Sequence, residues 1–309
     1  MSSRRAFQTA YRLALSTTLL MFGLMVIGSV VRTTGAGLAC PDWPLCQGRL
    51  IPPLRFDVLI EWFHRLVALL VSLLLFATAG WILTHRELRA RLGGLALLGI
   101  VLLAAQVLLG ALTVWKLLDP NVVAGHLGVA LLLFSTLLVL TLVARGEAEP
   151  EPVRPTRPAG LLPVFGVAAL LTYGQALLGG MVSANGAGLA CPDWPTCNGE
   201  WFPSLHGPVG LQMTHRYGAY ALGAMMLFTA MRARLALDGG ARRAGLAALA
   251  LTVVQVMLGV ANVLLGVPWW LSAAHLATAV TILALLITAA YRTAILPASE
   301  RALAVAVPT

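Results

Sequence analysis

Eight predominantly apolar stretches dominate the sequence, and each has about the 20 residues that a helix needs to cross a bilayer. They are residues 11–31, 60–84, 93–117, 122–143, 161–182, 212–231, 245–266 and 269–291. Inside lipid the backbone must satisfy its own hydrogen bonds, so stretches of this length are expected to be helical. Charged residues make up only 11% of the chain, against roughly 25% in soluble domains. The sequence predicts an all-α integral membrane protein with eight transmembrane helices.

A duplicated segment divides the chain into two equal parts. Residues 35–48 and 186–199 are identical at twelve of fourteen positions, at an offset of 186 − 35 = 151. Such self-similarity indicates an internal duplication, and an even number of spans per repeat keeps both copies in the same orientation. We expect two tandem, pseudo-symmetric four-helix bundles, 1–145 and 161–309, joined by a polar, proline-rich cytoplasmic linker at 146–160.

The net charge of +9 indicates membrane topology rather than a nucleic-acid partner. The chain has one Lys and no basic cluster interleaved with aromatic residues. With the N-terminus placed inside, six basic residues lie outside and fifteen inside, which predicts that both termini are cytoplasmic. The fifteen are Arg4, Arg5, Arg12, Arg86, Arg89, Arg91, Arg145, Arg154, Arg157, Arg232, Arg234, Arg242, Arg243, Arg292 and Arg301.

The only four cysteines lie in two long outer loops, 32–59 and 183–211. Four cysteines allow three pairings. Local disulfides, Cys40–Cys46 and Cys191–Cys197, are the simplest, because five residues separate the members of each pair and the outer face is oxidising. The disulfides could staple the loops or exchange with a thiol partner. A zinc site is disfavoured, because the spacing lacks close C-x-x-C pairs.

Four histidines repeat with the duplication. His64 and His215 differ by 151 positions, and His126 and His275 differ by 149. Each opens a span that runs from outside to inside, so all four are expected about one turn in from the outer surface. Zinc would want three or four ligands, whereas two imidazoles from facing helices suit the axial positions of a haem iron.

Four residues near these histidines add to the pattern. Glu61 lies three residues before His64 and shares its helix face, and the equivalent residue in the second half is Gln212. Glu61 could serve as a proton-handling group or simply favour the helix dipole. Arg65 and Arg216 follow the histidines directly and could pair with haem propionates or anchor the helices at the interface.

These features together resemble the haem A synthase family, over about residues 10–292. The motifs are Glu-x-x-His-Arg at 61–65, single histidines opening three later spans, and a cysteine pair in each outer loop, as in the bacterial version with both pairs. The resemblance implies a multi-pass enzyme of a bacterial or archaeal plasma membrane. It would oxidise the C8 methyl group of haem O to a formyl group, giving haem A for cytochrome oxidase.

The resemblance also implies a role for each half. His215 and His275 would ligate a resident haem b, the cofactor, while His64 and His126 would hold haem O, the substrate. Glu61 would be the essential catalytic carboxylate, because methyl hydroxylation and dehydration of a gem-diol both move protons. Gln212 cannot take up or release a proton at physiological pH.

Two alternatives remain open from the sequence. One is a di-haem electron carrier from quinol to an outer-face acceptor, and the other is a haem transporter or chaperone. The sequence leaves undefined the electron donor, any thiol donor, the source of the formyl oxygen, the oligomeric state and the handover of haem O from haem O synthase.

Overall fold

The computed structural model describes residues 3–149, 160–235 and 239–295. These residues form eight long helices and two short 3₁₀ helices. The 3₁₀ helices η1 (Ala36–Leu38) and η2 (Ala187–Leu189) occupy equivalent positions of the repeat. The long helices are α1 (Ser3–Thr33), α2 (Phe56–Thr84), α3 (Arg86–Trp115), α4 (Pro120–Ala148), α5 (Leu161–Ala184), α6 (Gly207–Arg234), α7 (Gly239–Leu264) and α8 (Trp269–Ile295).

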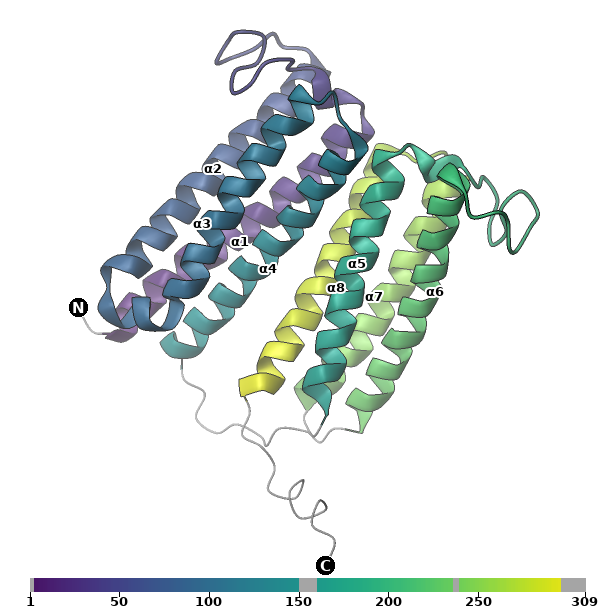
Figure 1. Cartoon of the computed structure of the whole chain (residues 1–309). Helices are drawn as coiled ribbons and strands as arrows, with labels where there is room; N and C mark the ends of the chain where they lie inside the picture. The colour runs from purple at the N-terminus through teal and green to yellow at the C-terminus, as the bar shows by residue number, and fades with distance from the viewer. Residues whose placement is uncertain (1–2, 150–159, 236–238, 296–309) are drawn as a thin grey trace, which may run out of the picture.

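The eight helices form two bundles side by side, α1–α4 and α5–α8 (Figure 1). The two bundles touch through α1, α4, α5 and α8, while α2, α3, α6 and α7 lie further out. The arrangement confirms the predicted tandem four-helix halves. The first bundle ends at Ala148 rather than at 145, and most of the predicted linker, 150–159, lies outside the described residues, as do 296–309.

Several helices are longer than the apolar stretches that predict them. The first begins at Ser3 rather than at 11, and α3 begins at Arg86 rather than at 93. Arg, Leu and Ala favour helix, so the backbone continues past the apolar segment into the polar interface. A conventional cap starts α4, where the Asp119 side chain accepts from the N–H groups of Asn121 and Val122 beside Pro120.

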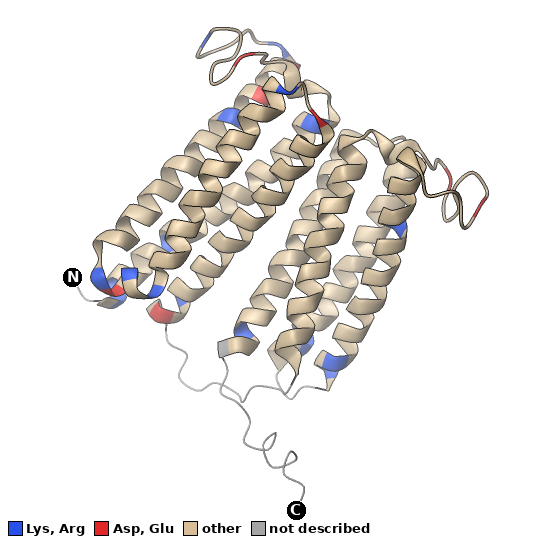
Figure 2. Cartoon of the chain, viewed as in Figure 1, with Lys and Arg blue, Asp and Glu red and all other residues tan. Residues whose placement is uncertain are grey.

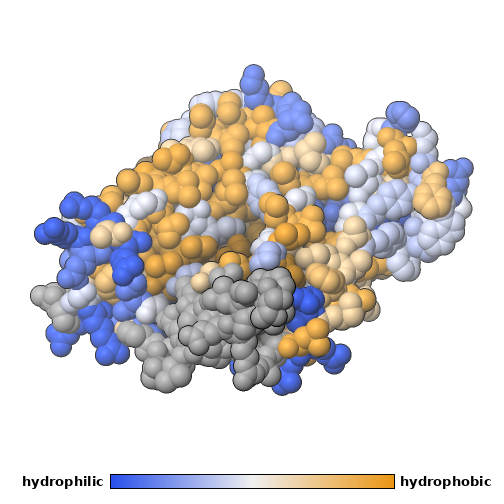
Figure 3. Space-filling view, turned by 60° about the horizontal axis from the view of Figure 1, so that its bottom comes forward, coloured by the Kyte–Doolittle hydropathy of each residue, from blue (hydrophilic) through white to orange (hydrophobic). Residues whose placement is uncertain are grey.

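The outer faces of the helices are apolar, as lipid requires. In the described residues seven helices, all except α6, are long and apolar enough to cross a membrane. Leu73, Phe76, Val101 and Met257 are among the exposed large side chains, and hydrophobic residues cover much of the surface between the hydrophilic ends (Figure 3). Charged residues gather at the two ends of the bundles (Figure 2). The predicted class, an integral membrane protein of helices, is therefore confirmed.

The eighth predicted span, 212–231, lies within α6. This helix has 28 residues, enough to cross a bilayer at 1.5 Å per residue, and it packs between α5 and α7. It is less apolar than its neighbours because it contains His215, Arg216 and several Gly and Thr residues. Its crossing of the membrane stays a prediction.

Helices of the first bundle are joined by buried hydroxyls as well as by apolar packing. The side chain of Thr17 on α1 bonds that of Thr78 on α2 at 3.2 Å, and Thr18 bonds Thr141 on α4 at 3.0 Å. Each hydroxyl also lies 2.7–2.8 Å from the carbonyl oxygen four residues earlier in its own helix, so within each pair one hydroxyl donates to that carbonyl and the other donates to its partner hydroxyl. Such interhelical bonds, worth about 0.6 kcal/mol each in a membrane, fix the relative register of the helices.

Candidate functional site

The four repeated histidines lie on four different helices, toward the end that carries the long loops. His64 is on α2, His126 on α4, His215 on α6 and His275 on α8. They follow the first residue of their helices by 64 − 56 = 8, 126 − 120 = 6, 215 − 207 = 8 and 275 − 269 = 6 residues. This is about two turns from each helix start, and the predicted depth of one turn from the outer membrane surface stays a prediction.

The histidines form two pairs, one inside each bundle. His64 lies close enough to His126 for the two imidazoles to interact electrostatically, and His215 stands in the same relation to His275. Among the described residues, no three His, Cys, Asp or Glu side chains gather as a metal-ligand set. Each bundle therefore offers two nitrogen ligands, which fits an iron whose remaining ligands come from a porphyrin better than it fits zinc.

A glycine on the neighbouring helix supports each imidazole. A Cβ added at Gly28, Gly110, Gly179 or Gly259 would lie 3.1, 3.3, 3.0 and 3.1 Å from the Cε1 atom of His64, His126, His215 and His275, respectively. Contacts this short would push the ring, so only glycine leaves the histidine in its place. The four glycines follow the same offsets as the histidines, 179 − 28 = 151 and 259 − 110 = 149. These shared offsets make the four glycines recognisable from the sequence alone.

A cavity of about 1110 Å³ is lined by all four histidines and by residues of both bundles. Its volume slightly exceeds the usual range for one small-molecule site. Glu61, Gln212, Arg65 and Arg216 also line it. An apolar, roomy cavity that receives two pairs of imidazoles fits porphyrins, with one imidazole pair for each iron.

The ring nitrogens of the four histidines differ in whether they have a hydrogen-bond partner. The Nδ1 atoms of His64, His126 and His275 are buried without a hydrogen-bond partner among the described residues. Nε2 of His126 bonds the side-chain nitrogen of Gln106 at 3.2 Å, so this amide joins α3 to α4 at the histidine itself. His215 differs from the other three, because its Nδ1 atom lies 3.0 Å from Nε2 of Gln175.

Both outer loops are closed by the predicted disulfides. Cys40 pairs with Cys46 and Cys191 with Cys197, with Cα atoms 4.5 and 4.6 Å apart. All four cysteines are buried. Their sulfurs therefore provide no free thiolates for zinc.

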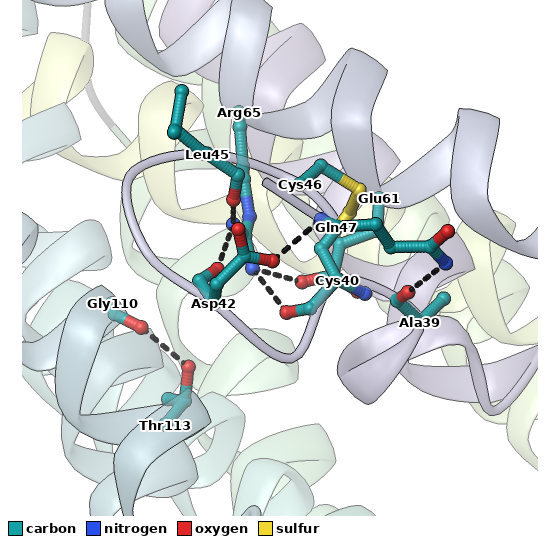
Figure 4. A network of polar contacts seen from close by, with 10 residues as sticks. All are labelled: Ala39, Cys40, Asp42, Leu45, Cys46, Gln47, Glu61, Arg65, Gly110 and Thr113. Atoms are coloured by element: carbon teal, nitrogen blue, oxygen red, sulfur yellow. Dashed lines mark hydrogen bonds and ion pairs between the residues drawn. A yellow bond between two sulfur atoms is a disulfide. The ribbon is translucent and has the colours of Figure 1, made fainter. Parts of the chain in front are cut away.

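The loops are held on the bundles by the two arginines that follow the histidines. The Arg65 guanidinium donates to the carbonyl oxygens of Cys40, Asp42 and Leu45 at 2.6–2.8 Å (Figure 4). Arg216 does the same in the second half, donating to Thr196 and Cys191. These donors are committed to the loops, and contact between either arginine and a propionate stays a prediction.

Glu61 binds the first outer loop, three residues before His64 on α2. Its carboxylate accepts from the Cys40 N–H at 2.8 Å and pairs with Arg65 at 2.5 Å, and the side chain is 5% exposed (Figure 4). In the other half Gln212 donates to the Gly188 carbonyl at 3.2 Å, and its Oε1 is buried without a partner among the described residues. The carboxylate keeps further lone pairs for a proton from the cavity, whereas the amide cannot ionise.

Two residues that the sequence analysis did not single out lie at the site. Arg32, at the end of α1, donates to the carbonyl oxygens of Ser183 and Ala184 on α5 and lines the cavity. Gln175 contacts His215 as described above. The equivalent residues in the other half are Ser183 and Leu24, so neither repeats. A comparison of the halves for differences, rather than for identities, would have found both.

The fold and the site define a class: a polytopic helical membrane protein with a histidine pair suited to a porphyrin iron in each of two repeated bundles. The sequence profile of the COX15-CtaA family, described as cytochrome oxidase assembly protein, matches residues 11–58 and 54–287. The chain belongs to this family.

Curated relatives support the same assignment. The chain is 34% identical to the heme A synthase of Symbiobacterium thermophilum, with 80% of this chain and 83% of the relative covered. It is 32% identical to that of Methylobacterium sp. (strain 4-46), with 85% and 86% covered. It is 30% identical to that of Shewanella oneidensis, with 88% and 93% covered. The resemblance to haem A synthases is therefore confirmed.

Proposed function

We propose that this protein is a haem A synthase, which oxidises the C8 methyl group of haem O to a formyl group for cytochrome oxidase. The observation that carries the proposal is the repeated histidine pair, accompanied by a carboxylate in one half and an amide in the other. Relatives that share most of the chain's length are named heme A synthases, and none of the three described above is named a transporter or an electron carrier.

The two halves have different tasks in this proposal. His215 and His275 hold a resident haem b, which supplies one-electron redox chemistry when bound. His64 and His126 hold haem O, the substrate, in the half that contains Glu61. The glycines behind the rings fix the imidazoles in both halves, and the cavity that receives them is mostly apolar.

Glu61 is the group that receives and returns protons as the methyl group is oxidised. Its position supports this role, because it lines the cavity and shares a helix face with His64. Arg65 and the Cys40 N–H fix the direction of its carboxylate. A carboxylate held by a cation and a backbone donor keeps one geometry between turnovers, and such positioning favours proton transfer.

The chain crosses a bacterial plasma membrane eight times, α6 included, with both termini in the cytoplasm. The basic residues support this orientation, with fifteen at the proposed inner ends and six at the outer ends. The disulfides and the four histidines then lie at the outer end of the bundles. The proposed partners are haem O synthase, an electron donor and a thiol donor.

The substitution Glu61→Gln tests the proposed reaction, because it copies the residue that the second half carries at Gln212. General acid–base catalysis contributes about 10²–10⁴-fold, so haem A formation in cells that supply haem O should fall by about that factor. The resident haem b should stay. The measurement is extraction and chromatography of the pigments of the purified protein.

Gln212→Glu is the matched control and should leave haem A formation within a few-fold of wild type. Normal haem A from Glu61→Gln would contradict the role of Glu61. Two equivalents of haem b with no hydroxymethyl or formyl haem from wild type would contradict the synthase itself and favour the di-haem carrier.

A further inference from the structure

We infer that Gln175 is a positioning residue that fixes the His215 imidazole and thereby makes the second half the one that retains its haem. This inference rests on the proposed function, since it assigns a resident haem to the second half. It concerns a residue that the duplication does not repeat. The equivalent of Gln175, at 175 − 151 = 24, is Leu24.

The amide of Gln175 contacts His215 at two points. Its Nε2 atom lies 3.0 Å from the ring Nδ1 atom and 2.8 Å from the backbone carbonyl oxygen of the same residue. The two contacts tie the amide to the backbone of His215 and place it against the ring Nδ1 atom. The Nδ1 atoms of His64, His126 and His275 have no such partner among the described residues, so His215 is the one histidine of the four with a fixed Nδ1.

Space for this amide is provided by a second difference between the halves. A Cβ at Gly218 would lie 2.3 Å from Oε1 of Gln175, which no ordinary contact allows. The equivalent of Gly218, at 218 − 151 = 67, is Val67, and Val67 and Leu24 belong to one buried apolar cluster. The first half therefore has Leu with Val where the second half has Gln with Gly. The exchange of both residues together indicates a built contact rather than an isolated polar side chain.

The hydrogen-bond partner of a metal-bound imidazole sets its orientation and basicity. When iron takes the Nε2 lone pair of His215, the ring proton lies on Nδ1 and needs an acceptor. Gln175 provides one when Oε1 rather than Nε2 faces Nδ1, and the bond from Nε2 to the His215 carbonyl is then given up. His64 lacks this support, which suits a site whose haem must enter as substrate and leave as product.

The test compares three variants at position 175 in the full-length protein purified with its haem. Gln175→Leu copies the first half and should weaken haem b retention by about 10–100-fold, the usual effect of losing such a partner. It should also raise the reduction potential of the remaining haem b, because a less basic imidazole stabilises the ferric state less. Gln175→Glu keeps an acceptor and should retain haem b with a lowered potential. Gln175→Asn shortens the reach and should resemble Leu.

The reciprocal experiment transfers the contact to the first half. The double variant Leu24→Gln/Val67→Gly should retain more haem in that half than wild type or Val67→Gly alone, as measured by haem equivalents per protein. Unchanged haem content and potential in Gln175→Leu, in a protein whose wild type carries haem b, would overturn the inference and leave the synthase intact. Wild type without any haem b would instead overturn the proposed function.

Discussion

At the scale of single residues, the site depends on what stands behind each histidine. The four glycines approach the imidazoles at 3.0–3.3 Å, measured from an added Cβ to Cε1, so they define where each ring can lie. A metal site tolerates only small displacements of its ligands. The glycine at each of these positions is therefore as much a part of the site as the imidazole that it supports.

Gly179→Ala should reduce haem b occupancy in the second half. The added methyl group would lie 3.0 Å from Cε1 of His215, and overpacking of this kind costs about 1–3 kcal/mol. The haem absorbance per purified protein measures the effect. Gly174→Ala, on the same helix, is the control. Its added methyl group has nothing within 4 Å and Ala favours helix over Gly, so haem b occupancy should stay unchanged. Equal haem content in the two variants would exclude the supporting role.

At the scale of the elements, each outer loop is organised by one aspartate. In the first loop the backbone of Gln47 and Gly48 has positive φ angles of 54° and 69°, which turns two N–H groups toward the Asp42 carboxylate. The N–H of Gly48, followed by that of Gln47, lowers the pKa of Asp42. Asp193 receives the same bonds in the second loop from Asn198 and Gly199. The first loop also presents the carbonyl oxygens that Arg65 binds. The order of this loop therefore affects the position of the Glu61 carboxylate, which pairs with Arg65.

The first loop should lose order in acid. A carboxyl whose folded pKa is depressed stabilises the folded form above its unfolded pKa of about 3.9 and loses that contribution as the pH falls through the folded value. Hydrogen exchange of the amides of Gln47 and Gly48 should therefore be protected at neutral pH and lose its protection below about pH 4. Asp42→Asn should lose the protection at every pH. Asp57→Asn is the control, and a wild-type loop protected equally at pH 2 would contradict the assignment.

The sequence predicts the elements of this fold well and their contacts less well. Apolar length alone predicts the helices, and the duplication predicts the pairing of histidines and cysteines. Apolar length does not predict where each helix begins, because helices extend past their apolar stretches, as α6 does from 212 back to Gly207. The duplication does not predict Gln175 and Arg32, because neither residue is repeated in the other half. The bonds from Arg65 to three loop carbonyls are not predictable either, since they depend on how the loop folds back over α2.

At the scale of the whole molecule, the two bundles share one cavity although each has its own histidine pair. Helices α1, α4, α5 and α8 form the contact between them. The contact is close enough that a Cβ at Gly180 on α5 would lie 2.6 Å from Leu127 on α4. In the proposed function, the resident haem and the substrate haem are therefore held in one shared cavity.

Arg32 should contribute measurably to the stability of the contact between the two bundles at their outer ends. Its guanidinium, on α1, donates at 2.6 and 3.3 Å to the carbonyl oxygens of Ser183 and Ala184, which lie at the C-terminal end of α5 where a cation is favourable. Bonds to charged groups contribute about 1.5–3 kcal/mol, so Arg32→Ala should lower the melting temperature in detergent by about 3–8 °C.

Arg55→Ala is the matched control for this prediction. Arg55 also forms an ion pair, with Asp57, but its side chain is 69% exposed and that of Asp57 42% exposed. Exposed pairs contribute about 0–1 kcal/mol, so the melting temperature should hardly move. Tryptophan fluorescence during heating measures both variants. Equal melting temperatures would mean that apolar packing of α1, α4, α5 and α8 alone holds the halves in contact, and that Arg32 contributes nothing to the shared cavity's stability.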